Sequence, residues 1–253
     1  MVIIDVERID AVIFDLDGVI TQTASTHARA WKQLFDQFLA RRATETDRLF
    51  IPFDLENDYR RYVDGKPRIA GVTSFLAARG ITVPTGAPGD QVELETAHGL
   101  AGRKDHYFAK LLAHEGINVS PSAEPLLHEA RKRGLRTAVA SSSHHCAEIL
   151  HTAGLTALFD ARVDGIDLDR LGLAGKPAPD MFLEAARRLN AFPARIAVFE
   201  DATAGVEAAR AGGFGLVVGV GPAARAPGLL NHGADKVVAD LGEVEFEGQR
   251  GLP

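Results

Sequence analysis

The sequence predicts an α/β fold: a doubly wound parallel sheet, forming a Rossmann-like core, with an all-helical cap inserted after the first strand. Short apolar runs alternate with helical patterns in residues 115–253, and this alternation is typical of crossovers between parallel strands. Residues 23–114 interrupt this alternation, because they carry helical patterns only. We therefore predict a core of residues 1–22 and 115–253 and a helical cap of residues 23–114.

The core strands are predicted from apolar runs. Residues 11–14 are apolar at every position and are followed by an acid, which is typical of a strand buried on both faces of a parallel sheet. Similar runs occur at 135–140, 196–199, 214–220 and 236–239. Helical patterns with Gly or Asn near their ends lie between them, at 123–133, 146–153, 179–189 and 204–211. Residues 221–228 are expected to form a surface loop.

The cap is predicted to contain helical segments joined by proline-containing loops. These segments are residues 24–41, a stretch near 58–63, 69–78 and 91–114. Ligands of α/β folds bind at the carboxyl ends of parallel strands. A helical insert directly after the first strand is therefore expected to form a lid over that end of the sheet.

Composition excludes several classes of protein. The chain has 253 residues, 46% hydrophobic and 25% charged, which is ordinary globular usage. Its one cysteine, Cys146, cannot form an internal disulfide, so we expect a reducing compartment, the cytoplasm. The net charge of -6 disfavours nucleic acid and anionic membranes as partners. Acids in the first apolar stretch argue against a signal peptide. We expect a monomer.

The strongest chemical signal is the pair Asp15 and Asp17 at the end of the first core strand, followed by Gly18. Gly18 allows a sharp exit from the strand, so both carboxylates can turn toward one site. One carboxylate can act as a nucleophile toward phosphorus and the other as general acid and base. Two such close charges need a cation, and hard oxygens prefer Mg²⁺. Taken alone, the pair could also be an acidic turn without chemistry.

Three further signals follow later strands. Glu200 and Asp201 form a second acidic pair that can complete a metal site. A run of serines follows the strand at 135–140, and hydroxyl and backbone N–H groups at a helix start bind phosphate oxygens. Lys176 supplies a cation from a loop that contains Pro177 and Pro179. Together, the order acid, hydroxyl, lysine and acid predicts phosphoryl transfer at the strand ends.

These motifs resemble those of the haloacid dehalogenase-like superfamily. The resemblance rests on FDLDGVIT at 14–21, the serine after the second strand, GKPAPDMF at 175–182 and FEDATAGVEAARAGGF at 199–214. With a helical insert after the first motif, the chain is similar to the β-phosphoglucomutase-like branch. The resemblance implies Mg²⁺-dependent phosphoryl transfer through an aspartyl-phosphate, with a small sugar phosphate as substrate.

The resemblance also implies roles for the acids. Asp15 would be the nucleophile and Asp17 the general acid and base. Mg²⁺ would be held by Asp15, the backbone carbonyl of Asp17 and Asp201, with Glu200 nearby.

Phosphate contacts are implied in both domains. Ser141 and Lys176 would hold the transferring phosphoryl group, and Ser143, with Ser142 beside it, matches a position that contacts the distal phosphate. In the cap, Arg68 would grip the second phosphate from a lid loop. The other cap positions that the resemblance places near the acid/base aspartate or the sugar phosphate are Thr23, His27, Gly65, Arg103 and Lys104.

Other site types are disfavoured. The run Ser141–Ser143 followed by His144 does not predict a serine hydrolase, because side chains of sequence neighbours rarely point toward each other and no G-x-S-x-G elbow occurs. His144, His145 and Cys146 lack a second cluster at zinc-like spacing, so we expect a polar helix start with a packed Cys146. Residues 219–224 match G-x-G-x-x-A, but the prolines of 222–228 prevent the long helix that a dinucleotide site needs.

Three functions stay open. The first is a phosphoglucomutase acting on β-glucose 1-phosphate through a bisphosphate, and the second is a phosphatase of a small sugar phosphate. They differ in whether a sugar hydroxyl or water attacks the aspartyl-phosphate, and water exclusion by a lid favours the mutase. The third is a catalytically silent binding module, against which the intact acids Asp15, Asp17 and Asp201 argue.

Overall fold

The computed structural model describes residues 1–47 and 49–248. Contacts within the chain divide it into two units. The core unit contains Met1–Gln22 and the chain from Ile117 onward, and the helical unit contains Thr23–Gly116. The helical unit is thus inserted soon after the first strand of the main sheet.

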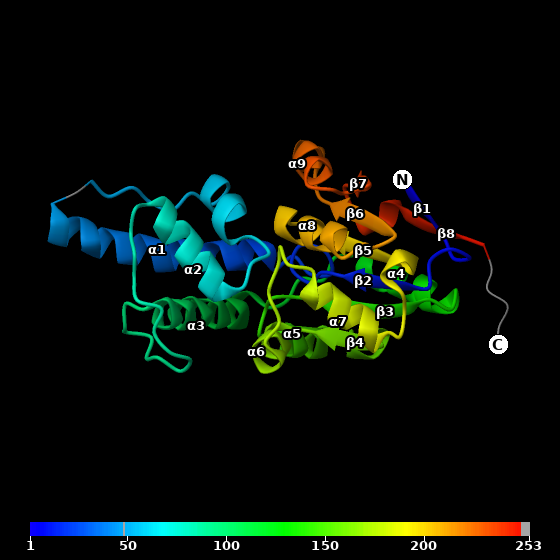
Figure 1. Cartoon of the computed structure of the whole chain (residues 1–253), viewed down its shortest axis with the longest axis horizontal. Helices are drawn as coiled ribbons and strands as arrows, with labels where there is room; N and C mark the ends of the chain where they lie inside the picture. Colours follow the sequence, from blue (N-terminus) through cyan, green and yellow to red (C-terminus); the bar gives the residue numbers. More distant parts are fainter. Residues whose placement is uncertain (48, 249–253) are drawn as a thin grey trace. The chain divides into compact units, whose positions relative to one another are not determined.

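The core unit is built on a six-stranded sheet with the order β4-β3-β2-β5-β6-β7 (Figure 1). All neighbouring strands are parallel, which confirms the predicted fold class. The chain adds strands outward from β2 in one direction and then from β5 in the other, so the carboxyl ends of β2 and β5 form a topological switch point. The strands are β2 (Ala11–Phe14), β3 (Arg136–Ala140), β4 (Ala161–Val163), β5 (Ile196–Glu200), β6 (Leu216–Val220) and β7 (Lys236–Val238).

Helices cover this sheet. They are α4 (Ala123–Lys132), α5 (Cys146–Thr152), α6 (Gly165–Leu171), α7 (Asp180–Arg188), α8 (Thr203–Ala211) and α9 (Ala226–Asn231). Every residue of β2 and β5 is buried, as expected for strands with both faces covered. On one face, Ile13 and Val198 belong to one apolar cluster with Phe182 of α7 and Val206 of α8. Burial of this apolar surface stabilises the central strands and so fixes where their ends lie.

Several core elements escaped the sequence prediction. β1 (Val2–Asp5) and β8 (Val244–Glu247) form a separate two-stranded parallel sheet, and β4 and α6 were also not predicted. The surface loop predicted at 221–228 is wrong in part, because a 3₁₀ helix (Ala223–Arg225) leads directly into α9. Pro227 lies in the first turn of α9, where a missing N–H group costs no helical hydrogen bond.

The helical unit contains α1 (Ala24–Thr46), a π-helix (Tyr59–Val63), α2 (Arg68–Ala78) and α3 (Ala97–Glu115), and no strand occurs among its described residues (Figure 1). Its core is aromatic. The ring of Phe35 lies 5.2 Å from Trp31, 5.3 Å from Phe53 and 4.2 Å from Phe75, measured between centroids. These rings join α1 to α2 and to the chain between them.

Two predicted boundaries in the helical unit are wrong. α1 continues beyond Arg41 to Thr46. The helix predicted at 91–114 begins at Ala97, because Thr96 acts as its N-cap. The Thr96 hydroxyl accepts the Gly99 N–H at 3.0 Å and donates to Asp90 Oδ2 at 2.6 Å. This capping arrangement gives the residues before Ala97 a turn conformation.

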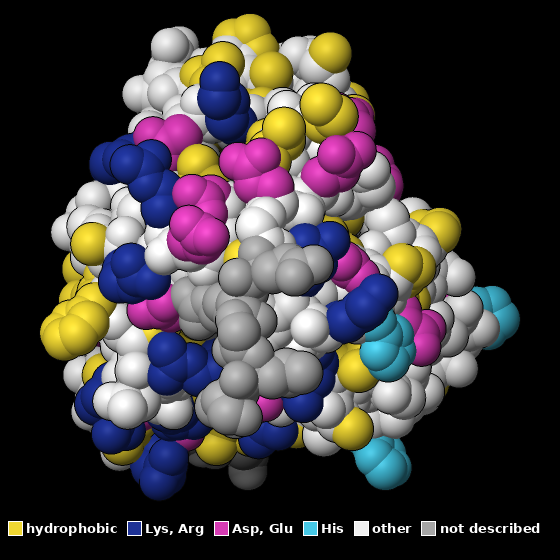
Figure 2. Space-filling model, turned by 90° about the vertical axis from the view of Figure 1, so that its right-hand side faces the viewer, with side chains coloured by type: hydrophobic (Ala, Val, Ile, Leu, Met, Phe, Trp, Pro, Cys, Tyr) yellow, Lys and Arg dark blue, Asp and Glu magenta, His cyan; other side chains and the backbone are white. Residues whose placement is uncertain are grey.

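Charged side chains of both signs share the face drawn in Figure 2, with apolar side chains scattered between them. Many charged side chains among the described residues form ion pairs, for example Arg195 Nε with Asp10 Oδ2 at 2.7 Å. Among the helices of the described chain, none combines the length and the apolar character that crossing a bilayer requires.

Candidate active site

Two acidic motifs meet at the switch point of the sheet. β2 and β5 pair in register, with Phe14 opposite Phe199, so the residues that follow, Asp15 and Glu200, emerge side by side. One carboxylate oxygen from each of Asp15, Glu200 and Asp201 lies within 4.8 Å of the other two. All three side chains are buried. The register of the sheet therefore brings Asp15 together with Glu200 and Asp201, which lie far from it in the sequence.

Lys176 lies inside this acidic cluster. Its Nζ donates to Asp15 Oδ1 and Glu200 Oε1, both at 2.5 Å, and to the Ala140 carbonyl at 3.2 Å. Burial acts to lower the pKa of Lys176, but Asp15 and Glu200 outweigh it and raise the pKa above its ordinary value. Burial raises the pKa of Asp15; Lys176 opposes this rise, and Glu200 and Asp17 reinforce it. A further cation here would favour ionised Asp15.

Two glycines leave room for the buried acids. A Cβ on Gly205, in the first turn of α8, would lie 1.7 Å from Glu200 Oε1. A Cβ on Gly18 would lie 2.3 Å from Asp201 Oδ2, and Gly18 also has a φ of +97°, which favours glycine. The sequence analysis did not select Gly205, although it lies in the fourth motif. The sequence signal that could have identified Gly205 is its position one helical turn after Glu200 and Asp201.

Asp17 and Ser141 come together from the ends of β2 and β3. Ser141 Oγ donates to Asp17 Oδ2 at 3.2 Å. The Ser143 N–H donates to Ser141 Oγ at 3.1 Å, and the His145 N–H donates to Ser143 Oγ at 3.2 Å. The hydroxyl of Ser143 thus also holds the start of α5, and half-buried Ser142 lies between the two bonded serines.

The serine loop rests on the start of α6. The Gly165 N–H donates to the Ser143 carbonyl at 3.1 Å, and His144 Nε2 lies 3.1 Å from Asp169 Oδ2. Cys146 is buried as predicted, and burial raises the pKa of its thiol, with nearby carboxylates adding to the effect. The thiol is therefore held in its neutral form and packs as a small apolar group.

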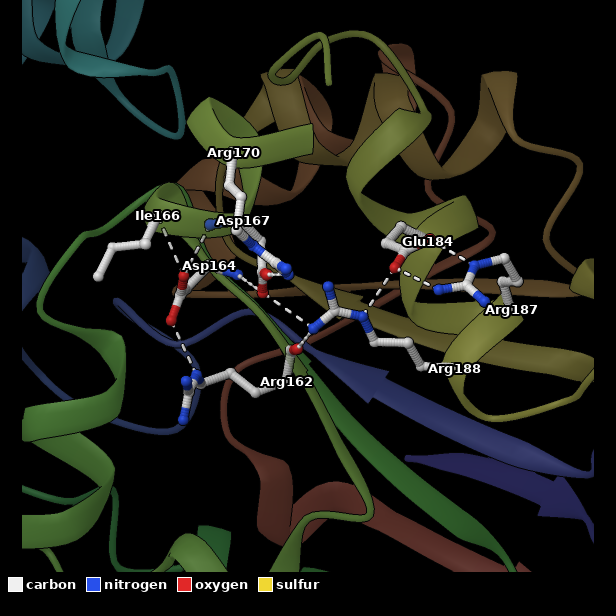
Figure 3. A network of polar contacts seen from close by, with 8 residues as sticks. All are labelled: Arg162, Asp164, Ile166, Asp167, Arg170, Glu184, Arg187 and Arg188. Atoms are coloured by element: carbon white, nitrogen blue, oxygen red, sulfur yellow. Dashed lines mark hydrogen bonds and ion pairs between the residues drawn. The ribbon is translucent and has the colours of Figure 1, made fainter. Parts of the chain in front are cut away.

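A polar network holds α6 in turn (Figure 3). Asp164 caps α6, and Arg188 of α7 donates to Asp167 Oδ2 at 2.9 Å and to Glu184 Oε1 at 2.8 Å. The hydrogen bond from Arg188 lowers the pKa of Asp167 to about 2. The hydrogen bond from Arg187, followed by that from Arg188, lowers the pKa of Glu184 to about 2. The Arg188–Asp167 ion pair ties α6, and with it the serine loop, to α7, while the pairs with Glu184 lie within α7.

Arg225 is a neighbour of the acidic cluster that the sequence analysis missed. Its Nη1 donates to Asp201 Oδ2 at 3.3 Å, and its Nη2 donates to the Asp201 carbonyl at 2.5 Å. Arg225 follows β6, which lies beside β5 in the sheet. The signal that could have found it is this position, since segments that follow adjacent parallel strands emerge at one edge of the sheet.

In the helical unit, two predicted residues lie together. Lys104 Nζ lies 2.6 Å from His27 Nδ1 and 4.8 Å from the centroid of the Phe108 ring, and the His27 ring stacks on Phe108 at 3.8 Å. Lys104 is only 2% exposed. The adjacent Arg103 instead donates from Nε to the Val92 carbonyl at 2.7 Å. Of these two candidates, the structure places Lys104 with His27.

The other predicted residues of the helical unit lie at turns and helix starts. Thr23 is the N-cap of α1, and its carbonyl accepts the His27 N–H at 2.9 Å. Gly65 has a φ of +71° in the turn before α2. Arg68 begins α2 and pairs through Nη1 with Asp105 of α3. Within this unit, a carboxylate therefore already engages the Arg68 guanidinium.

The acidic cluster has the chemistry of a Mg²⁺ site. Its donors are oxygen atoms of Asp15, Glu200 and Asp201, and hard oxygen ligands suit Mg²⁺. Gly18 keeps the space beside Asp201 free of a side chain. The residues present therefore fit a small divalent cation.

Comparison with known proteins agrees with this arrangement. The family model for haloacid dehalogenase-like hydrolases matches residues 9–213, which span β2, Lys176 and the pair Glu200 and Asp201. The chain belongs to this family. Within the haloacid dehalogenase-like family, it is similar to β-phosphoglucomutases over nearly its whole length.

Three haloacid dehalogenase-like relatives illustrate the similarity. The β-phosphoglucomutase of Mycobacterium tuberculosis is 48% identical over 241 residues, which cover 94% of this chain and 92% of that protein. The β-phosphoglucomutase of Bacillus subtilis is 33% identical and covers 94% and 92%. The crystal structure of β-phosphoglucomutase from Clostridium difficile has a TM-score of 0.72 at 26% identity and covers 93% and 92%.

Proposed function

We propose that the protein is a Mg²⁺-dependent β-phosphoglucomutase that converts β-glucose 1-phosphate to glucose 6-phosphate. The observation that carries the proposal is the buried contact of Asp15 with Lys176, beside Glu200 and Asp201 at the switch point of the sheet. Similarity to β-phosphoglucomutases over 94% of the chain supports the choice of substrate. We further propose that the enzyme is a cytoplasmic monomer.

In this mechanism Asp15 is the nucleophile. Its carboxylate attacks a phosphorus atom of a glucose bisphosphate and forms an aspartyl-phosphate, while the bond from phosphorus to the sugar oxygen breaks. Asp17 protonates the departing oxygen and later accepts the proton of the attacking hydroxyl. Ser141, which donates to Asp17 Oδ2 at 3.2 Å, is suited to bind a phosphoryl oxygen beside it. Lys176 orients Asp15 and neutralises charge on the phosphoryl group.

Mg²⁺ would be held by Asp15, the backbone carbonyl of Asp17 and Asp201, with Glu200 nearby. When bound, the ion supplies charge neutralisation for the phosphoryl oxygens. Glu200 also makes two hydrogen bonds beside this cation site. Its Oε1 accepts from Lys176, and its Oε2 accepts the Ala202 N–H at 2.8 Å. Glu200 therefore holds Lys176 against the start of α8.

The second phosphate of the bisphosphate needs its own cation. We propose that Arg68 supplies it, since a guanidinium can bind phosphate in a bidentate manner. The phosphate would have to replace Asp105 as the partner of Arg68. We also propose that Lys104 and His27 form a substrate-binding pair, because they already lie 2.6 Å apart.

A direct assay tests this function. The enzyme is incubated with β-glucose 1-phosphate, Mg²⁺ and a trace of glucose 1,6-bisphosphate, and glucose 6-phosphate and inorganic phosphate are followed together. We expect glucose 6-phosphate to form with little phosphate release, EDTA to stop the reaction and Mg²⁺ to restore it. Rapid phosphate release without glucose 6-phosphate would show that the enzyme is a sugar-phosphate phosphatase and not a mutase.

A further inference from the structure

Arg225 makes two different contacts with one residue of the acidic cluster. Its Nη1 lies 3.3 Å from the Asp201 carboxylate oxygen Oδ2, and its Nη2 binds the Asp201 backbone carbonyl. The Arg225 side chain is 19% exposed and that of Asp201 is 6% exposed. Because one planar guanidinium contacts both the main chain and the side chain of Asp201, it restrains the direction in which the carboxylate points.

The Gly18 backbone also confines the Asp201 carboxylate. Gly18 approaches so closely that an added Cβ would lie 2.3 Å from Oδ2 and 2.6 Å from Cγ. Both the Gly18 backbone and the Arg225 guanidinium therefore limit the space open to the Asp201 carboxylate. The other two acids of the cluster, Asp15 and Glu200, are held by Lys176 instead. Each carboxylate of the cluster thus has a cation that fixes its position.

We propose that Arg225 is a positioning residue for the cation site, acting through Asp201. Groups that hydrogen-bond to a metal-ligating side chain orient it, and losing one weakens metal binding about 10- to 100-fold. This inference rests on the proposed function, because it takes Asp201 as a Mg²⁺ ligand. It assigns a role to the 221–228 segment, which the mechanism does not otherwise use.

Removing Arg225 has two opposing effects on Mg²⁺ affinity, and the sign of the net change shows which effect is larger. Loss of a positive charge near three carboxylates would by itself strengthen Mg²⁺ binding. Loss of the two restraints on Asp201 would weaken it. We expect the second effect to dominate, because Asp201 is buried and both restraints act on it directly.

The test measures Mg²⁺ binding by calorimetry and by the Mg²⁺-dependent rise in melting temperature, together with the Mg²⁺ concentration that half-activates the enzyme. In Arg225→Gln we expect all three measures to show about 10-fold weaker binding, with kcat at saturating Mg²⁺ within about 3-fold of wild type. Arg225→Lys, which keeps the charge but not the planar fork, should fall between wild type and Arg225→Gln.

The matched control is Arg210→Gln. Arg210 is exposed and pairs with Asp235, so this variant removes the same charge from the same unit without touching the cluster. Its Mg²⁺ affinity should equal that of wild type. Unchanged or tighter Mg²⁺ binding in Arg225→Gln would overturn the role of Arg225 while leaving the proposed function intact. A wild-type protein that does not bind Mg²⁺ would overturn both.

Discussion

Replacing Gly205 by alanine should disable the site even though alanine is the better helix former. The new Cβ would lie 1.7 Å from Glu200 Oε1 and 2.0 Å from its Cδ, so the carboxylate must move by roughly 1.5 Å or more to reach ordinary contact distance. Glu200 is 0% exposed and accepts from Lys176 and from the Ala202 N–H. Its movement therefore breaks at least one of these two contacts and weakens the support that Glu200 gives Lys176 beside Asp15.

The size of the effect follows from these contacts. Loss of a charge-assisted hydrogen bond costs about 1.5–3 kcal/mol, whereas the gain in helix propensity returns only about 1 kcal/mol. A net loss of about 0.5–2 kcal/mol should lower the melting temperature by about 1–8 °C in a chain of this size. A shift of Lys176 by about 1 Å should lower kcat/KM by about 10²-fold.

Formation of glucose 6-phosphate and thermal unfolding measure both consequences of Gly205→Ala. The control is Gly228→Ala in α9, where an added Cβ would meet no atom within 4 Å. That variant should keep wild-type activity and melt at the same or a slightly higher temperature. If Gly205→Ala kept full activity and stability, the proposed coupling of α8, Glu200 and Lys176 would be refuted.

Three further predictions address the nucleophile, the second phosphate and the acid stability of the core unit. Asp15→Asn should lower phosphoryl transfer by several orders of magnitude in the same assay, and near-normal turnover would exclude Asp15 as the nucleophile. Arg68→Ala should lower mutase flux by about 10²-fold or more but change hydrolysis of a small aryl phosphate much less; equal losses would place Arg68 elsewhere in the mechanism. Because the folded-state pKa values of Asp167 and Glu184 are lowered to about 2, their ion pairs should stabilise the fold above pH ~4 and be lost as the pH falls toward 2. The difference in unfolding free energy between wild type and the double variant Asp167→Asn, Glu184→Gln should therefore shrink from about 1–2 kcal/mol at pH 7 toward zero near pH 2, after allowance for solvent screening; a pH-independent difference would contradict this.

The sequence predicted those parts of the fold whose signal lies within a single segment. β2 and β5 are continuous apolar runs, and the acids that follow them emerge at one edge because parallel strands share their direction. β1 and β8 were missed because each is short and gains its stability by pairing with the other, across the 241 residues that lie between Val2 and Val244. Such long-range pairing produces almost no recognisable pattern in the sequence of either strand alone.

Side-chain partners in the site were predicted less well than its motifs. The sequence left Arg103 and Lys104 as equal candidates, because the choice depends on which face of α3 is buried against His27. Arg225 was missed because a proline-rich stretch favours a loop, whereas a 3₁₀ helix there brings the guanidinium to Asp201. Both outcomes depend on packing between segments far apart in the chain.

The central claim is that phosphoryl groups pass between Asp15 and sugar hydroxyls without reaction with water. The most direct test is to run the reaction of β-glucose 1-phosphate and a trace of bisphosphate in ¹⁸O-labelled water and to analyse the products by mass spectrometry. We predict glucose 6-phosphate without ¹⁸O in its phosphoryl group and only a minor amount of inorganic phosphate. Inorganic phosphate that carries one solvent ¹⁸O and forms faster than glucose 6-phosphate would contradict the claim, because water would then be the group that attacks the aspartyl-phosphate.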